Sequence, residues 1–366
     1  MRLPAETATT VADGENTTAP SGAVVEAAFG AKNRSRLIDT YFSQASDDVT
    51  PSRAWAHVYR MLLWVDQANG LAHCYESDKS QPGKNWYARS LAFHDWVSSA
   101  LGVSPDQLAD AIDWLFRRAT ADLAMQVMRR AARVAAAAEK QRKPYESRNF
   151  PRPGEDPELV SIVREVLGEH ISAEPPPEKW QELVQRIRQY LALENKRKNL
   201  VGEGFEDVLA HVVRRMAPST ALEVHTRRLL HDLPGFNRAR QGDKPNKVDL
   251  AVLRPGRRTL VTAKWSLRAD REKQFAQEFF AYVEAESHRE RFEYVFVTNE
   301  FDPARLMRAC EQLAGNKLMF DQVVHISTDA IKATYGNSQE PTMKRVVELI
   351  DGGRLVSLER WLAMLA

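Results

Sequence analysis

The spacing of apolar residues divides the chain into a helical first part and a mixed second part. Helical spacing is clearest in residues 121–142, which are rich in Ala, Met and Arg. From about residue 200 the pattern changes to strands and helices. The predicted order is helix 203–216, strand 247–254, strand 258–265, helix 270–289, strand 292–298, helix 303–314, strand 321–327 and a helical tail. This order predicts an α/β fold in which helices flank a mixed central sheet.

Interruptions of the pattern predict the domain limits. Residues 1–35 lack periodic apolar positions and are predicted to form a disordered tail. Residues 36–143 are predicted to form an N-terminal helical domain, and residues 144–157, which contain four prolines, a linker. A helix is expected to start at 157, and helices then continue to about 195 with an interruption at prolines 175–177. Residues 158–366 make up the second predicted domain.

Composition points to a soluble protein with a local basic region. The chain has 366 residues, is 43% hydrophobic and contains two cysteines that are far apart in sequence. It lacks an apolar stretch long enough to span a bilayer and an N-terminal secretory signal, which predicts a cytoplasmic protein without a membrane partner. Eleven basic and four acidic residues occur between Gly235 and Lys273, against a net charge of +2 for the chain. This segment is either a polyanion-binding site or a solvated basic hairpin.

A predicted hairpin brings an acid and a lysine together. The sequence Arg254-Pro255-Gly256-Arg257 suits a type II turn, with Pro at the second position and Gly at the third. A turn at these residues pairs positions whose numbers sum to 511, so Asp249 is expected to lie opposite Thr262. Lys264 shares a face with Thr262 because side chains alternate along a strand. The pairing predicts a carboxylate and an ammonium side by side on rigid strands.

The helix after the hairpin carries an acid on its apolar face. That face is marked by Phe275, Phe279 and Tyr282. Glu278 follows Phe275 by three positions and precedes Tyr282 by four, so it is expected on the same face. A buried carboxylate needs a cation, a metal or a function. The alternative is a structural ion pair of Glu278 with Arg271 or Lys264.

Three acids or near-acids and a lysine in one place are what metal-dependent phosphodiester cleavage requires. Mg²⁺ is a hard ion that prefers carboxylate and water oxygens. It stabilises charge on a phosphate and acidifies an attacking water, while a neighbouring lysine offsets the developing charge. Asp249, Lys264 and Glu278 are therefore candidate catalytic residues.

These residues carry a resemblance to a known family. Asp249 followed by Thr262-Ala263-Lys264 resembles the PD-(D/E)xK nuclease motif, except that Thr262 replaces the second acid. The continuation K-x3-R-x-D-R-x6-E, from Lys264 to Glu278, resembles the CCGG-recognising branch of type II restriction endonucleases (the BsaWI and AgeI types). In that branch the second acid has migrated to the following helix, where Glu278 stands here. The resemblance implies a restriction-endonuclease-like core.

The resemblance also implies roles for individual residues. Asp249 and Glu278 would be Mg²⁺ ligands, and Lys264 the catalytic lysine. Base recognition in the major groove would fall to Arg268, Asp270 and Arg271. Arg donates two parallel hydrogen bonds to guanine, and Asp accepts from the amino groups of cytosines. For Asp270 the alternative is a helix N-cap, and for the two arginines, helix-surface charge.

Related nucleases often place a further glutamate on the helix before the hairpin. In residues 202–213 the predicted core face includes Phe205, Val208, Leu209, Val212 and Val213. Glu206 borders that face, whereas Glu203 is expected to be more exposed. Glu206 is therefore the candidate upstream acid, with a solvated acid at the start of the helix as the alternative.

The function implied by the resemblance is specific. The chain would be a Mg²⁺-dependent type II restriction endonuclease that cuts palindromic double-stranded DNA with a CCGG core. Cutting before the first C would leave 5′ four-base overhangs, and BsaWI-type enzymes imply W-CCGG-W flanks. Two-fold symmetric cleavage implies a homodimer or a higher homo-oligomer. A prokaryotic host would protect its own sites with a cognate DNA methyltransferase.

Two other hypotheses remain open. Thr262 in place of an acid also fits a non-catalytic DNA-binding protein with this fold. A different PD-(D/E)xK enzyme, such as a repair or structure-specific nuclease, would use Asp249 and Lys264. Such an enzyme would leave the R-x-D-R element unexplained.

Overall fold

The computed structural model describes residues 50–65, 157–170, 173–216, 221–238, 245–267, 272–288 and 290–365, with isolated residues between 35 and 143. Almost all of the predicted tail and linker, and most of the predicted N-terminal helical domain, lie outside the described residues. Arg268, Asp270 and Arg271 also lie outside them. The domain limits drawn from the sequence therefore stay predictions.

The chain divides into two compact units. The first contains Met1–Val11, Arg34–Phe116 and Leu200–Ala366, and the second contains Ala12–Asn33 and Arg117–Asn199. The described elements of the second unit are α6 (Pro157–Leu167), η4 (Gly168–His170) and the first part of α7 (Pro177–Met216). In this unit the Arg164 guanidinium lies 5.1 Å from the centroid of the Trp180 ring, and it forms an ion pair with Glu174.

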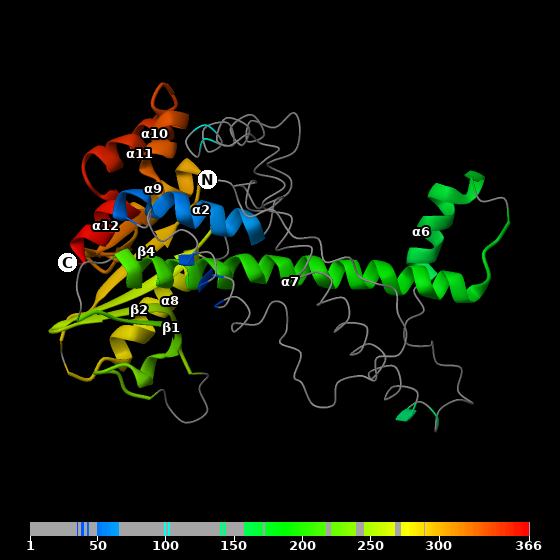
Figure 1. The fold of residues 1–366 in the computed structure, drawn as a ribbon, viewed down its shortest axis with the longest axis horizontal. Helices are drawn as coiled ribbons and strands as arrows, with labels where there is room; N and C mark the ends of the chain where they lie inside the picture. The colour runs from blue at the N-terminus through cyan, green and yellow to red at the C-terminus, as the bar shows by residue number, and fades with distance from the viewer. Residues whose placement is uncertain are drawn as a thin grey trace. The chain divides into compact units, whose positions relative to one another are not determined.

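A six-stranded mixed sheet forms the centre of the first unit (Figure 1). Its strands, in spatial order, are β1 (Glu223–Leu229), β2 (Lys247–Arg254), β3 (Arg257–Lys264), β4 (Glu293–Thr298), β7 (Gln322–His325) and β8 (Leu355–Ser357). The pairs β1–β2 and β2–β3 are antiparallel, whereas β3, β4, β7 and β8 run parallel. A separate small hairpin joins β5 (Leu313–Ala314) to β6 (Lys317–Leu318). The predicted mixed α/β architecture is confirmed.

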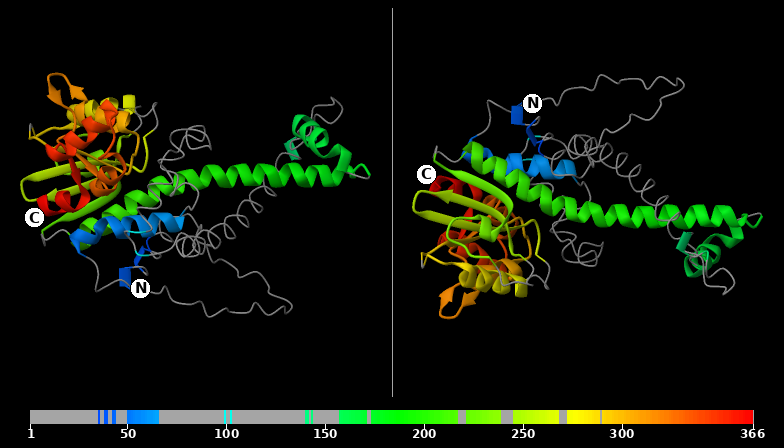
Figure 2. Two further views of the ribbon diagram at one scale, coloured as in Figure 1. Left: turned by 90° about the horizontal axis from the view of Figure 1, so that it is seen from above. Right: turned by 90° about the horizontal axis from the view of Figure 1, so that it is seen from below.

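Helices and short 3-10 turns flank this sheet (Figure 2). They are η2 (Pro51–Arg53), α2 (Ala54–Val65), η5 (Leu230–Asp232), α8 (Glu272–Ala285), α9 (Pro303–Glu311), α10 (Thr328–Tyr335), α11 (Pro341–Asp351) and α12 (Leu358–Met364), with the C-terminal part of α7. Asp302 caps α9 by accepting hydrogen bonds from the backbone N–H groups of Ala304 and Arg305. A search of the described helices for a bilayer-spanning segment finds none.

The β2–β3 hairpin has the predicted turn and register. Gly256 adopts φ 71°, a left-handed conformation that glycine reaches without steric cost. Arg254 pairs with Arg257, and Leu250 pairs with Val261, so paired residue numbers sum to 511 as predicted. Both strands are buried along nearly their whole length, which explains their nearly continuous apolar sequence.

Aromatic packing fixes α8 against the sheet. The Phe275 ring centroid lies 5.0 Å from that of Phe296 on β4 and 5.5 Å from that of Phe320. Phe275 and Tyr282 are buried, as predicted, and Phe279 is half-buried. Each large buried aromatic ring contributes roughly 1.5–3 kcal/mol through removal of its surface from water. This packing holds the helix, and with it Glu278, over the sheet.

Several features of the fold differ from the prediction. The predicted helical tail also contains β8, a strand of the central sheet, and the predicted helix 303–314 ends at Glu311 and is followed by the β5–β6 hairpin. The predicted helix 203–216 is the last part of one 40-residue helix, α7, which begins at Pro177. Gly202 and Gly204 do not end this helix, because each lowers helix propensity by only about 1 kcal/mol. Strand β1 was not predicted, because most of its side chains are only partly buried and its sequence EVHTRRL lacks an apolar run. It is an edge strand, so only part of its surface needs to be apolar.

Candidate active site

The predicted acid and lysine form a close ion pair. The Nζ atom of Lys264 lies 2.6 Å from Oδ2 of Asp249. The same oxygen accepts hydrogen bonds from the Ala263 backbone N–H at 2.9 Å and from the Thr262 hydroxyl at 3.3 Å. The side chains of Lys264 and Asp249 are 24% and 22% exposed. Three donors on β3 therefore fix one carboxylate of β2, and solvent still reaches the pair.

The pair lies where the parallel strands end. Lys264 is the last residue of β3, and it stands in register with Thr298, the last residue of β4. Asp249 lies near the start of the antiparallel strand β2, which brings it to the same end of the sheet. In open α/β sheets, the carboxyl ends of parallel strands are the usual place for ligand binding.

Glu206 reaches this place from α7. It is buried, at 8% exposure, whereas Glu203 is exposed, as the helical phase predicted. Burial, reinforced by the negative charge of Asp249, raises the pKa of Glu206 to about 8, although Lys264 and Arg227 oppose the rise. The structure thus brings Glu206 into electrostatic contact with both Asp249 and Lys264.

Glu278 reaches the same place from α8. Its carboxylate accepts a hydrogen bond of 3.4 Å from the hydroxyl of Tyr294, which is fully buried on β4. Burial, followed by the charge of Glu278, raises the pKa of Tyr294 well above its usual value, so this hydroxyl keeps its proton and stays a donor. Glu278 is half-buried, and its charge is one of those that raise the pKa of Lys264.

Electrostatics link all four predicted residues. Burial disfavours the Lys264 ammonium, but Asp249, Glu278 and Glu206 outweigh that effect and raise the pKa of Lys264. Lys264 therefore stays charged at neutral pH. Its direct partner is Asp249, so the simple Lys264–Glu278 ion pair considered from the sequence does not account for the arrangement.

The donor set fits a hard divalent cation. In the part of the chain that the structure describes, no three His, Cys, Asp or Glu side chains form a ready-made metal cluster. Mg²⁺ does not require one, because it commonly binds one or two carboxylates and takes water or phosphate oxygens for its other positions. Asp249 and Glu278 supply two carboxylates at an accessible end of the sheet. The pKa of the neighbouring Glu206 is raised by burial first and by the charge of Asp249 second.

Two neighbours of the site were missed by sequence reasoning. Tyr294, which donates to Glu278, is one of several aromatic residues in a predicted strand, and the sequence does not distinguish it. Arg227, which forms an ion pair of 3.0 Å with Glu206, belongs to the unpredicted strand β1. A correct prediction of β1 and its pairing with β2 would have identified Arg227, since residue 227 then lies opposite Asp249.

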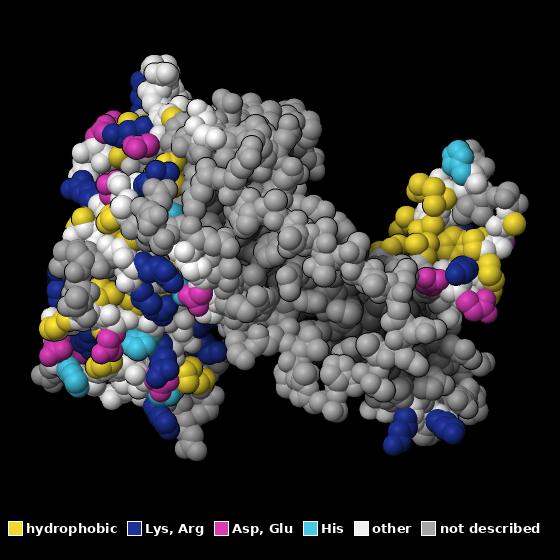
Figure 3. All heavy atoms as spheres, viewed as in Figure 1, with side chains coloured by type: hydrophobic (Ala, Val, Ile, Leu, Met, Phe, Trp, Pro, Cys, Tyr) yellow, Lys and Arg dark blue, Asp and Glu magenta, His cyan; other side chains and the backbone are white. Residues whose placement is uncertain are grey.

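The basic segment is less positive than its count of charges indicates. Arg257 pairs with Glu293, and Arg258 pairs with Glu286 at 2.9 Å. Figure 3 shows Lys and Arg side chains spread over the visible described surface of the first unit, with Asp and Glu side chains among them. Several charges of this segment therefore stabilise the protein itself.

Comparison with known proteins gives similarity in fold only. No family model and no curated protein matches the sequence. Among solved structures, the chain is similar to the restriction endonuclease PspGI in complex with substrate DNA, with 10% sequence identity, a TM-score of 0.40 and coverage of 91% of each chain. It is also similar to metal-depleted Ecl18kI in complex with uncleaved, modified DNA, with 13% identity, a TM-score of 0.33 and coverage of 90% of this chain and 82% of that chain. At this level of similarity, the chemistry must be argued from the residues of the site.

Proposed function

We propose that the chain is a Mg²⁺-dependent type II restriction endonuclease that hydrolyses phosphodiester bonds in double-stranded DNA. The observation that carries the proposal is the Asp249–Lys264 pair on adjacent strands, with Glu278 and Glu206 in electrostatic contact with it. An accessible lysine among carboxylates, at the carboxyl end of parallel strands, suits a phosphate substrate better than a purely structural ion pair does.

The side chains divide the chemistry between them. The Lys264 ammonium offsets negative charge that develops on the phosphate during attack by water. Asp249 orients this ammonium through the contact of 2.6 Å. Glu206 adds a further acidic side chain beside the pair. Burial and the charge of Asp249 raise its pKa, while Lys264 and Arg227 oppose the rise.

Asp249 and Glu278 are the residues that would hold the metal. A bound Mg²⁺ would act as a Lewis acid on the phosphate and would lower the pKa of a water molecule. Thr262 supports this assignment, because it is buried at 1% exposure and donates to Asp249 instead of offering a second carboxylate. The second acid is then Glu278 from α8, as the sequence spacing implies.

The substrate part of the proposal rests on the spacing of residues in the sequence. Only four to seven positions separate Lys264 from Arg268, Asp270 and Arg271. This short separation lets the three side chains contact bases next to the scissile phosphate. Two guanidinium groups and a carboxylate match the hydrogen-bonding groups of a CC/GG half-site. We therefore include a palindromic CCGG core, cutting before the first C, and W-CCGG-W flanks in the proposal.

A second copy of the chain and a methyltransferase complete the proposal. One chain offers one such site among its described residues, while a palindrome has two strands to cut. A homodimer places the two sites by symmetry. A cognate methyltransferase would protect the host DNA without forming a stable complex.

The test is cleavage of a random DNA library followed by sequencing of the ends. With Mg²⁺ we expect ends that fall within CCGG and carry 5′ four-base overhangs, and with EDTA we expect no cleavage. Cleavage at flaps or junctions would indicate a structure-specific nuclease. Specific binding without cleavage would indicate a DNA-binding protein, and scattered breaks would remove the CCGG assignment.

A further inference from the structure

Arg227 occupies an unusual position in the sheet. The β1–β2 ladder pairs Thr226 with Leu250 and Arg228 with Val248. Arg227 lies between these pairs, at the level of Asp249. Its φ is 49°, which makes it the only non-glycine residue with positive φ among the described residues. Such a conformation is unfavourable for an L-residue and persists where the surrounding contacts enforce it.

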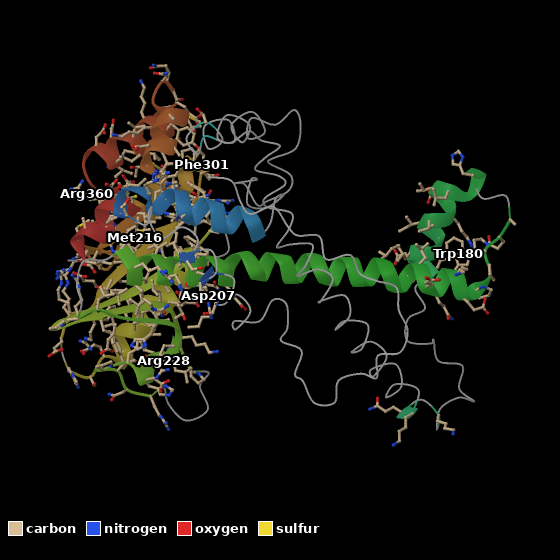
Figure 4. The ribbon with its side chains drawn as sticks, viewed as in Figure 1. Trp180, Asp207, Met216, Arg228, Phe301 and Arg360 are labelled. Carbon is tan, nitrogen blue, oxygen red and sulfur yellow. The ribbon has the colours of Figure 1, made fainter. Side chains whose placement is uncertain are left out.

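The contacts of the Arg227 side chain lie on α7. Nη1 is 3.0 Å from Oε2 of Glu206, and it also donates to the Glu203 carbonyl at 3.3 Å. Nη2 donates to the Asp207 carboxylate. The guanidinium group thus binds the side chains of two successive helix residues, which its planar fork allows. Figure 4 labels Asp207 on α7, and on β1 it labels Arg228, the neighbour of Arg227.

The three side chains form a half-buried cluster. Arg227 is 27% exposed, whereas the side chains of Glu206 and Asp207 are 11% and 10% exposed. Glu206 is also in electrostatic contact with Asp249 and Lys264. Arg227 on β1 therefore binds a glutamate whose charge interacts with the Asp249–Lys264 pair.

We propose that Arg227 is a positioning residue, which turns from the β1 ladder to fix the Glu206 carboxylate beside Asp249 and Lys264. This inference rests on the proposed nuclease function and assigns it a further residue. Among the residues of β1, Arg227 alone departs from the regular strand conformation, and it lies opposite Asp249. The contact with Asp207 holds the guanidinium at two points, so its orientation, and not its charge alone, determines where Glu206 lies.

The alternative is that Arg227 only neutralises two poorly solvated acids. A double-mutant cycle separates the two roles. Arg227→Gly removes the guanidinium and suits a positive φ, so the backbone conformation is retained. We expect kcat for cleavage to fall about 10–100-fold, as for other residues that orient a functional side chain, with KM unchanged. Arg227→Lys should restore only part of the loss.

The decisive measurement is Arg227→Gly in the Glu206→Ala background. A positioning residue has nothing left to position there, so we expect no further loss of kcat. Losses that multiply in the double variant would overturn the proposal. Arg228→Ala is the matched control, because Arg228 is 54% exposed and pairs with Asp232 at 3.8 Å, and it should leave kcat unchanged.

A crystal structure of the Arg227→Gly variant tests the inference independently of activity. We expect the Glu206 carboxylate to rotate away from Asp249, with the rest of α7 unchanged. A Glu206 side chain that stays in place would overturn the positioning role even if the wild type cleaves DNA. Failure of the wild type to cleave any DNA would remove the proposed function, and the crystal structure would still decide whether Arg227 fixes Glu206.

Discussion

Replacing Lys264 with methionine removes an ammonium group from among three carboxylates and keeps a side chain of similar length. Asp249 loses its contact of 2.6 Å, and Glu206 and Glu278 lose the positive charge that both of them face. The raised pKa of Lys264, which Asp249 maintains against the effect of burial, means that a full charge is removed at neutral pH. The substitution therefore tests the electrostatic balance of the site.

The size of the effect follows from the exposure of the pair. Breaking a fully buried ion pair costs about 3–5 kcal/mol, and a surface pair contributes about 0–1 kcal/mol. Since the side chains of Lys264 and Asp249 are 24% and 22% exposed, we expect the free energy of unfolding in EDTA to fall by about 2 kcal/mol, between these limits. Cleavage should fall at least about 10²–10³-fold, as when a group that stabilises developing charge is lost.

Mg²⁺ should partly reverse the loss of stability. A divalent cation bound by Asp249 and Glu278 takes over part of the role of the ammonium, so we expect Mg²⁺ to stabilise Lys264→Met more than it stabilises the wild type. Urea unfolding with EDTA and with Mg²⁺ measures this difference. Lys247→Met is the matched control, because Lys247 is exposed at the start of the same strand, β2.

Three results would refute this reasoning. Equal stability of Lys264→Met and the wild type in EDTA would mean that the carboxylates do not depend on the ammonium. An equal gain from Mg²⁺ would mean that the cation binds elsewhere. Retained cleavage would exclude Lys264 from the chemistry. Specific DNA binding is expected to survive the substitution, and a filter or fluorescence titration checks this.

Two further predictions concern Glu300, which follows β4, and Arg268, which follows β3. Burial raises the pKa of Glu300 to about 7, although three backbone N–H groups, including that of Leu267, donate to its carboxylate. The protonated form contributes stability that is present below about pH 4.5 and lost towards pH 7, so the cost of Glu300→Gln, measured by urea unfolding, should decrease by about 3 kcal/mol over that range. A cost that does not vary with pH would mean that Glu300 is ionised throughout. Arg268→Ala should weaken binding to a CCGG duplex by about 1–3 kcal/mol and relax one base position. Equal weakening for every duplex would assign Arg268 to the phosphate backbone instead.

The hairpin and its register were predictable because local rules determine both. Pro255 and Gly256 fix the position of the turn, and two-residue alternation then fixes which side chains face each other. Asp249, Thr262 and Lys264 lie within a few residues of that turn. Over so short a stretch of strand, the predicted pairing has little chance to shift out of register. Glu278 was predictable for a similar reason, since it lies between aromatic residues that define the buried face of α8.

The placement of Glu206 beside this hairpin was not predictable to the same degree. Helical phase identified it as the more buried of two acids, but phase alone does not say what a helix packs against. Its electrostatic interaction with Asp249 joins residues that are far apart in sequence, and this interaction depends on how α7 packs in the first unit. Only the family resemblance connected Glu206 with the proposed metal site.

Arg227 was beyond sequence reasoning because it breaks the rule that would have located it. A strand is recognised in a sequence by the alternation of apolar and polar residues. Strand β1 is an only partly buried edge strand, and its residue Arg227 does not pair with β2. Consistency between local preference and overall fold is the usual state of a sequence, and local violations concentrate where function requires them. An arginine with positive φ, opposite the acid of the site and bound to the helix that carries Glu206, is such a violation. If the strain served stability alone, Arg227→Gly would leave cleavage as it is, and that outcome would separate a feature of the fold from a feature of the chemistry.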